Sequence, residues 1–184
     1  MRAFTAIVII ATAVWAQELT PRDRAAAAAA GLGEVLKQLL SEELKKGGFE
    51  AAVKSCSESA QIVTEEFARE KGMEIRRVSL KYRNRKDQPD EWEAAKLREW
   101  ALAGGTPKEA VETVIENGKR YLRYLKPIII QPMCLSCHGA PGQIPGEVSA
   151  LLSERYPRDK ATGYKAGELR GAFSVTLPAG ESGH

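Results

Sequence analysis

Histidine and cysteine are scarce in this chain, which has 184 residues but only two histidines and three cysteines. One of the histidines, His184, is the last residue and is therefore a poor candidate for a built site. A Ser/His/Asp catalytic set needs a well-placed histidine, and a structural zinc site needs four ligands. The composition therefore argues against a hydrolase of that kind and against a zinc-binding domain.

A strong charge of one sign and a long apolar run are also missing. With 27 Lys and Arg against 24 Asp and Glu, the net charge is +3, which gives no reason to expect a nucleic-acid-binding surface. The longest apolar stretch, Ala3 to Val14, is shorter than the roughly 20 residues that a membrane-spanning helix needs. The length fits one domain rather than two.

The N-terminal residues have the pattern of a secretory signal peptide. Arg2 provides the positive start, Ala3 to Val14 the apolar core, and Val14-Trp15-Ala16 a small-x-small cleavage site. No cysteine lies near this site, which argues against a lipid anchor. We therefore predict that residues 1–16 are removed. The mature domain, 17–184, is expected in the periplasm or otherwise exported, without stable membrane insertion.

The sequence Cys134-Leu135-Ser136-Cys137-His138 has the C-x-x-C-H spacing that attaches c-type haem. Two thiols at this spacing can reach the two vinyl groups on one porphyrin edge, and the next residue then lies beneath the iron. A thioredoxin-like motif would need a helix afterwards, whereas Gly139-Ala140-Pro141-Gly142 follows. We predict one covalently bound haem c, attached to Cys134 and Cys137, with His138 as the proximal iron ligand.

The other side of the iron has few candidate ligands in the mature chain. Met133 adjoins Cys134 and would have to fold back under the ring. Met73 and Cys56 remain, and each could instead be an ordinary core residue. A lone cysteine in an exported protein is open to oxidation, which metal ligation would prevent. The residues alone leave three possibilities for this position, namely Cys56, Met73 and a vacant or water-bound site.

Hydrophobic spacing and capping residues predict a mixture of helices and strands. Thr106-Pro107-Lys108-Glu109 has the Thr-x-x-Glu pattern of a capping box, which predicts that a short helix starts there. Few and non-adjacent strands favour an α+β domain around a modest antiparallel sheet. The other predicted helices cover 22–46, 49–71, 89–103 and 147–156, and the predicted strands cover 73–83, 121–130 and 171–177.

Several segments resemble one family and occur in its order. They are Arg77–Asn84 with Pro89–Glu93, Tyr124–Ile128, Cys134–Gly139, and Tyr156–Tyr164 with Gly167–Val175. Over about residues 49–178 the chain resembles the exported single-haem c-type cytochrome domain with a PAS-like fold, long described as a domain of unknown function. That family occurs alone and as the extracytoplasmic input domain of signalling proteins. Tyr82 departs from the family pattern, in which proline is expected.

The resemblance implies a fold and a rare pair of axial ligands. The implied fold is α+β, with a PAS-like antiparallel sheet, flanking helices and a long N-terminal helix. The implied ligands are the histidine of C-x-x-C-H, here His138, and a cysteine thiolate from an upstream helix. Cys56, within Ala52–Ser57, matches that cysteine.

Two functions fit a haem with these ligands. A thiolate favours ferric iron, so reduction should weaken its bond and allow ligand exchange, as a redox or gas sensor requires. If both ligands stay in place, the protein would be a periplasmic electron-transfer cytochrome. A six-coordinate iron argues against an oxygen-activating enzyme, so we expect no enzymatic activity. The chain carries no kinase or methyl-accepting output, so a redox or signalling protein partner is expected.

Four basic residues could neutralise the haem propionates, since cationic side chains pair well with carboxylates. For each of them a solvated basic face is the favoured interpretation. They are Lys81, Arg83, Arg85 and Arg170.

Overall fold

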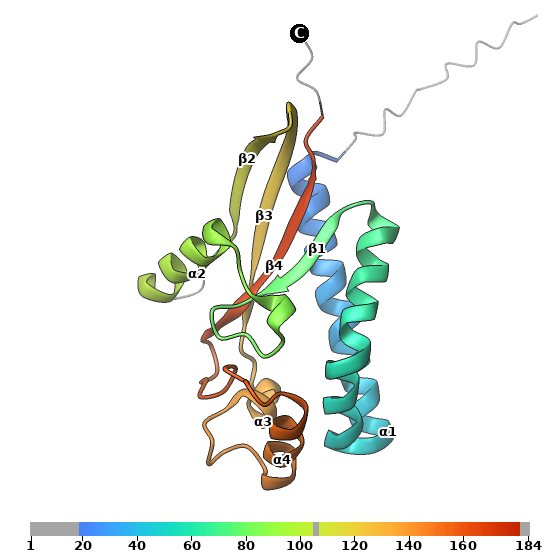
Figure 1. Ribbon diagram of the computed structural model, residues 1–184, viewed down its shortest axis with the longest axis vertical. Coiled ribbons are helices and arrows are strands. Elements are labelled where there is room, and N and C mark those ends of the chain that lie inside the picture. Colours follow the sequence, from blue (N-terminus) through green and yellow to red (C-terminus); the bar gives the residue numbers. More distant parts are fainter. Residues whose placement is uncertain (1–18, 105–106, 181–184) are drawn as a thin grey trace, which may run out of the picture.

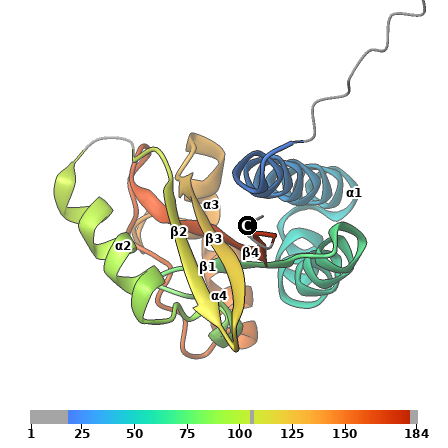
Figure 2. The ribbon, with the colours of Figure 1, turned by 90° about the horizontal axis from the view of Figure 1, so that it is seen from above.

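The computed structural model describes residues 19–104 and 107–180 and shows an α+β fold. Its four strands form one antiparallel sheet in the order β1-β4-β3-β2 (Figure 1). The sheet lies between a long N-terminal helix, α1, and a shorter helix, α2 (Figure 2). The strands are β1 Glu74–Val78, β2 Ala110–Glu116, β3 Lys119–Ile129 and β4 Leu169–Pro178. The predicted fold class, a PAS-like antiparallel sheet with flanking helices and a long N-terminal helix, is confirmed.

Helix α1, Pro21–Lys71, consists of two arms joined at Gly47 and Gly48. Gly48 has φ 62° and ψ −149°, a conformation that essentially only glycine adopts without strain. The chain reverses direction there, and the second arm returns beside the first (Figure 1). The second arm ends at Gly72, whose left-handed conformation lets its N–H reach the last carbonyls of the helix. The two helices predicted over 22–46 and 49–71 are therefore confirmed.

Small side chains let the first arm of α1 approach the sheet closely. Ala25, Ala29 and Leu32 are fully buried, and they pack in one core cluster with Tyr124 and Val175 of the sheet. The alanine run thus has two effects, since it favours helix and leaves room for the larger side chains of the strands.

Helix α2, Glu91–Ala103, covers the other face of the sheet. Its capping box is complete, because the Glu93 N–H donates to Asp90 at 2.9 Å and the Asp90 N–H donates to Glu93 at 2.8 Å. Leu97 then packs against Val78 and Leu125. The predicted helix over 89–103 is confirmed with a later first residue.

The helix predicted to start at Thr106–Glu109 is wrong. Thr106 itself lies outside the described residues, and Ala110–Glu116 forms strand β2, paired with β3. Asn117 and Gly118, with φ 51° and 74°, provide the two-residue turn that such a hairpin prefers. Glu109 does not cap a helix. Its carboxylate accepts a hydrogen bond from the Tyr124 hydroxyl at 2.9 Å. Cross-strand pairing therefore outweighed a local capping pattern.

Strand β1 is shorter than predicted and stops at Val78 instead of Arg83. At Gly171 of β4 a side chain would come within 2.2 Å of the Val78 carbonyl, so the two backbones approach closely where β1 ends. The chain then leaves the sheet and forms a short 3-10 turn, Arg85–Asp87.

The remaining elements lie at one end of the molecule, after β3 and before β4 (Figure 1). They are the 3-10 turn Pro132–Cys134, the single helical turn α3, Leu135–His138, and α4, Gly146–Arg155. Val148 and Leu152 of α4 pack against Val53, so this end rests on the second arm of α1. Within the described residues, no helix combines the length and apolar character needed to cross a membrane.

Candidate haem site

The C-x-x-C-H segment forms a compact turn between β3 and α4. Because Cys134, Cys137 and His138 are related by i, i+3 and i+4 over helical backbone, their side chains share one face. Gly139 ends the turn, and its N–H donates to the Leu135 carbonyl at 2.8 Å. A side chain at residue 139 would come within 2.6 Å of that carbonyl oxygen, so the tight ending requires glycine.

His138 is held in the tautomer that suits a metal ligand. Its Nδ1–H donates to the Ala161 carbonyl at 2.7 Å, which leaves Nε2 with a free lone pair. Desolvation, followed by the positive charges of Arg83 and Arg170, lowers the pKa of His138 to about 3. The imidazole is therefore neutral near pH 7, and neutral imidazole is the form that binds metals.

The loop that carries Ala161 is tied to the C-x-x-C-H segment by its backbone. The Tyr164 N–H donates to the His138 carbonyl at 3.0 Å, and the Gly163 N–H donates to the Gly139 carbonyl at 2.8 Å. The Tyr164 ring also meets the His138 ring edge-on, with 6.3 Å between centroids. These contacts hold the backbone and the ring of His138 against this loop.

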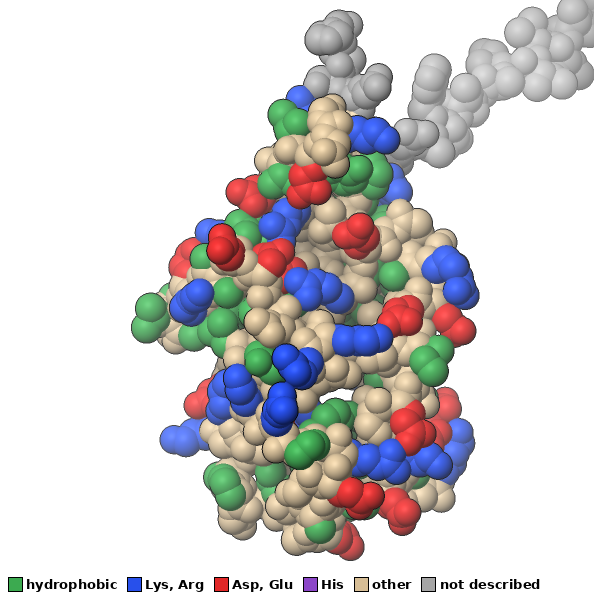
Figure 3. Space-filling view, viewed as in Figure 1, with side chains coloured by type: hydrophobic (Ala, Val, Ile, Leu, Met, Phe, Trp, Pro, Cys, Tyr) green, Lys and Arg blue, Asp and Glu red, His purple; other side chains and the backbone are tan. Residues whose placement is uncertain are grey.

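Cys56 reaches the same region from the second arm of α1. Its side chain is exposed, yet desolvation by the surrounding protein raises the pKa of its thiol, against the lowering effect of Arg77 and Arg83. Burial also raises the pKa of Cys137, and the charge of Cys56 adds to that effect. Figure 3 shows a hollow between the second arm of α1, which carries Cys56, and the α3–α4 end, which carries the C-x-x-C-H segment.

The structure brings Cys56 together with the C-x-x-C-H segment but keeps Met73 away from it. Met73 follows the end of α1 and packs against the core between α1 and the sheet. At a rise of about 1.5 Å per residue, the end of the arm at Lys71 lies roughly 20 Å beyond Cys56, and Met73 follows that end. Met133 has 51% of its side chain exposed.

Arg83 connects the C-x-x-C-H segment to its loop. Its Nε donates to Asp159 at 2.9 Å and its terminal nitrogen donates to the Cys137 carbonyl at 2.6 Å. Only 10% of its side chain is exposed. The interpretation as a solvated basic residue is therefore wrong for Arg83, because protein acceptors surround its guanidinium.

Arg170 is also not a solvated residue. It donates to the Ser79 hydroxyl at 2.7 Å and to the Lys81 carbonyl at 3.1 Å, and burial lowers its pKa. Arg85, in contrast, has an exposed side chain, as the solvated interpretation requires. Lys81 is also exposed, but its Nζ donates to the Thr162 carbonyl at 2.5 Å and lies 4.4 Å from the centroid of the Tyr164 ring.

Arg77 was not singled out from the sequence, although it lies beside the site. Its Nε is buried and has no hydrogen-bond partner among the described residues. Its positive charge acts on both Cys56 and His138. The alternation of β1 gave a usable signal, because Ile75 is buried and Arg77 stands on the same face of the strand two residues later.

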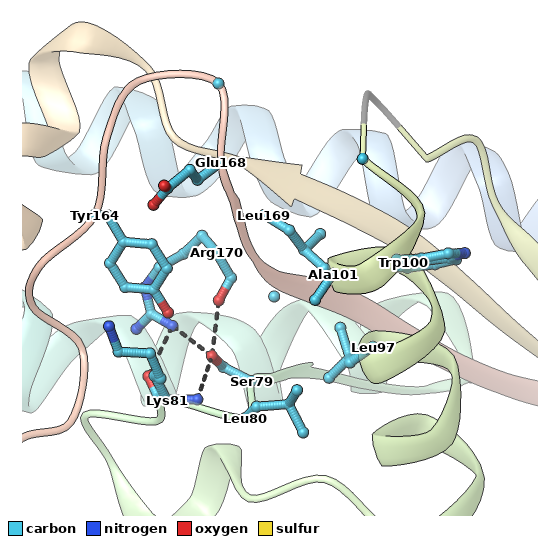
Figure 4. Close-up of a pocket in the computed structure, with 13 residues that line it drawn as sticks. Ser79, Leu80, Lys81, Leu97, Trp100, Ala101, Tyr164, Glu168, Leu169 and Arg170 are labelled. Carbon is cyan, nitrogen blue, oxygen red and sulfur yellow. Dashed lines mark hydrogen bonds between the residues drawn. The ribbon is translucent and has the colours of Figure 1, made fainter.

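A second cavity, of about 430 Å³, adjoins the site (Figure 4). Leu97 and Trp100 of α2 line one side, and Lys81, Tyr164 and Arg170 line the other. Tyr164 belongs to both places, because it lines this cavity and its ring contacts His138.

Comparisons with known proteins agree with this arrangement. The family model described as Tll0287-like matches residues 5–178, so it also takes in the first arm of α1, which precedes the resemblance over 49–178. The crystal structure of the cyanobacterial heme-protein Tll0287 is 26% identical and has a TM-score of 0.59. The match covers 86% of this chain and 97% of that chain. No curated protein matches significantly. The resemblance predicted from the sequence is confirmed, and the chain belongs to the Tll0287-like family.

Proposed function

We propose that this chain is an exported cytochrome with one covalently bound haem c that works as a redox or gas sensor. Cys134 and Cys137 would form the thioether bonds, and His138 and Cys56 would bind the iron from opposite sides. One observation carries this proposal. The C-x-x-C-H segment and the only other cysteine of the chain stand on separate elements that border the same hollow, and Cys56 is close enough to act on Cys137 through its charge.

The residues present fit a haem in their chemistry. His138 has a neutral, correctly oriented imidazole, and two thiols stand at the spacing that haem attachment needs. The buried Nε of Arg77 lacks an acceptor, as expected where an anionic group belongs to the complete site. The solved relative is described as a heme-protein, which supports the same cofactor here.

Haem would supply one-electron redox chemistry and a coordination position at which ligands can exchange. The chain sets the conditions for each ligand. The Ala161 carbonyl fixes the tautomer of His138, and Arg83 holds the Cys137 backbone in place. The positive charges of Arg77 and Arg83 favour the thiolate form of Cys56 against the desolvation that opposes it.

The two axial ligands differ in how they are held, and this difference favours sensing. His138 is fixed by a hydrogen bond and by the backbone contacts of its loop. Cys56 has an exposed side chain on a helix whose arm is joined to the rest of α1 only at Gly47–Gly48. Cys56 is therefore the ligand expected to leave on reduction, which would free a position for a small molecule and release the arm.

Electron transfer is the second candidate. The hydrogen-bonded loop around the C-x-x-C-H segment favours it, because a rigid site changes little between oxidation states. In that case both ligands would remain in place, and a redox protein would be the partner.

A potentiometric titration with optical spectra, with and without carbon monoxide, separates the two candidates. A sensor should lose the spectral signature of its sulfur ligand on reduction and then bind carbon monoxide. An electron-transfer cytochrome should keep a six-coordinate spectrum in the oxidised and the reduced state and should not bind carbon monoxide. If the purified exported protein contains no haem, both proposals fail.

A further inference from the structure

Arg77 stands on the face of β1 that looks toward α1 and the hollow. Strand residues alternate between faces, so Arg77 shares a face with the buried Ile75, while Arg76 belongs to the opposite face. Arg76 accordingly pairs with Glu93 of α2. Across the sheet, Arg77 lies opposite Phe173 of β4.

Arg77 differs from the other arginines of the site in what its guanidinium contacts. The guanidinium of Arg83 bonds Asp159 and the Cys137 carbonyl, and that of Arg170 bonds Ser79 and the Lys81 carbonyl. The Nε of Arg77 is buried without an acceptor among the described residues. Leaving a donor of a charged group buried and unpaired is costly, so an acceptor is expected to arrive with the complete site.

Asp87, the nearby carboxylate, does not serve as the acceptor that the Nε of Arg77 lacks. Asp87 is influenced by the charge of Arg77, but its Oδ1 accepts from Gln61 at 3.1 Å, and no ion pair joins it to Arg77 within the described residues. The charged groups that act on His138 are all arginines, namely Arg77, Arg83 and Arg170. The other carboxylate near these arginines, Asp159, pairs with Arg83 and so does not supply the acceptor that the Nε of Arg77 lacks.

We infer that Arg77 binds a propionate of the haem, an inference that rests on the proposed function. Haem brings two carboxylates on the edge opposite its vinyl groups. Because Cys134 and Cys137 hold the vinyl edge, a propionate partner must come from an element other than α3, and β1 ends above α3 in Figure 1. A guanidinium fork matches a carboxylate with two parallel hydrogen bonds.

The test uses the purified haem-containing protein with Arg77→Gln, Arg77→Lys and a matched control, Arg85→Gln. Arg85 has an exposed side chain on the neighbouring 3-10 turn, so the control removes the same charge without touching the hollow. Two properties are measured, namely the propionate bending band in resonance Raman spectra and the reduction potential. The ferric optical spectrum checks that the axial ligands are unchanged.

Arg77→Gln should shift the propionate band and lower the reduction potential, since a positive charge that favours the reduced form is lost. Arg77→Lys should change the reduction potential only slightly, because the positive charge is retained. It should still shift the propionate band, because an ammonium group cannot form the two parallel hydrogen bonds of a guanidinium. Arg85→Gln should leave the band unchanged and move the potential less.

An unchanged propionate band in both Arg77 variants would overturn the inference, even if the potential moved, because Arg77 would then act through its charge alone. If Arg77→Gln fails to fold, the propionate band of Arg77→Lys tests the inference alone, since this substitution keeps the positive charge and changes only the hydrogen-bond geometry. Absence of haem from the unmodified protein would instead contradict the proposed function.

Discussion

The two sides of the candidate haem site are built in different ways. On the side of His138, hydrogen bonds to Ala161, from Tyr164 and from Gly163 join the C-x-x-C-H segment to its loop. On the side of Cys56, the candidate ligand stands on a helix arm that contacts this end of the molecule through apolar packing, as between Val53 and Val148, and through an exposed ion pair between Glu58 and Arg155. The His138 side is fixed mainly by hydrogen bonds, whereas the Cys56 side is held mainly by apolar contacts and one exposed ion pair.

This difference suits the two sides to different roles, with the His138 side holding the cofactor and the Cys56 side releasing a ligand. In the proposed function, a proximal side with fixed tautomer and backbone would keep the cofactor in one position in either oxidation state. In the same proposal, Cys56 on the second arm of α1 would leave the iron at smaller cost, and its departure would change the packing of that arm on α4. The comparison therefore predicts that changes on the proximal side affect attachment and stability, whereas changes on the distal side affect coordination.

The largest expected effect follows from removing the attachment itself. With Cys134→Ala and Cys137→Ala together, no thioether can form, so haem should no longer stay with the polypeptide on a denaturing gel. Haem staining of the exported protein measures this directly, and unmodified protein serves as control. Staining that survives the double substitution would show that the haem is attached elsewhere.

Replacing the distal ligand should change the coordination but leave the attachment intact. Cys56→Ala is expected to alter the ferric low-spin spectrum, open a coordination position and raise the reduction potential, because a donating anionic ligand is lost. Cys56→Ser should behave similarly, since a neutral hydroxyl is a poor iron ligand.

Met73→Leu is the matched control for the Cys56 substitutions. Met73 packs in the core away from the site, so this near-isosteric change should leave the spectrum unaltered and cost less than about 1.5 kcal/mol of stability. If Met73→Leu alters the ferric spectrum and Cys56→Ala does not, the axial pair is His/Met. The comparison between a fixed and a releasable side would then lose its basis.

Local signals in the sequence were enough for most of the fold. Gly72 and the Asp90/Glu93 pair mark a helix end and a helix start through contacts between near neighbours in the chain, so their patterns could be recognised. Strand β2 was missed because the pattern at Thr106–Glu109 favours a helix start, and the turn signal at Asn117-Gly118 did not enter the prediction. Pairing with β3 depends on the whole sheet, which no local pattern records.

The residues of the candidate site also fall into those that local sequence reveals and those that only the fold reveals. Cys134, Cys137 and His138 are adjacent in the chain, and their spacing alone carries the chemistry. The Ala161 carbonyl and Arg77 act on His138 from distant parts of the sequence, so only the fold reveals them. The same is true of Arg83, whose partner Asp159 lies on a separate loop.

Weakening the proximal loop should reduce stability more than it changes coordination. Arg83→Met removes the bonds to Asp159 and the Cys137 carbonyl and leaves a largely buried carboxylate without its partner. Breaking such a pair costs about 3 kcal/mol in free energy of unfolding. Chemical denaturation measures this loss, with Arg155→Met as a control for an ion pair that is more exposed. Equal losses in the two variants would contradict the fixed character of the proximal side.

The smallest expected effect concerns the hinge of the distal arm. Gly48 has φ 62° and ψ −149°, which a residue with a side chain adopts only with strain, although nothing lies within 4 Å of the position where a Cβ would stand. Gly48→Ala should therefore lower the free energy of unfolding by about 1 kcal/mol through backbone strain alone. If the arm carries a releasable ligand, the same change should alter the rate of carbon monoxide binding to the reduced protein while leaving the ferric spectrum unchanged. Gly142→Ala is the control, since residue 142 has an ordinary φ and open space around it. Identical binding rates in Gly48→Ala and unmodified protein, together with the expected loss of stability, would show that the hinge supports the fold without controlling Cys56.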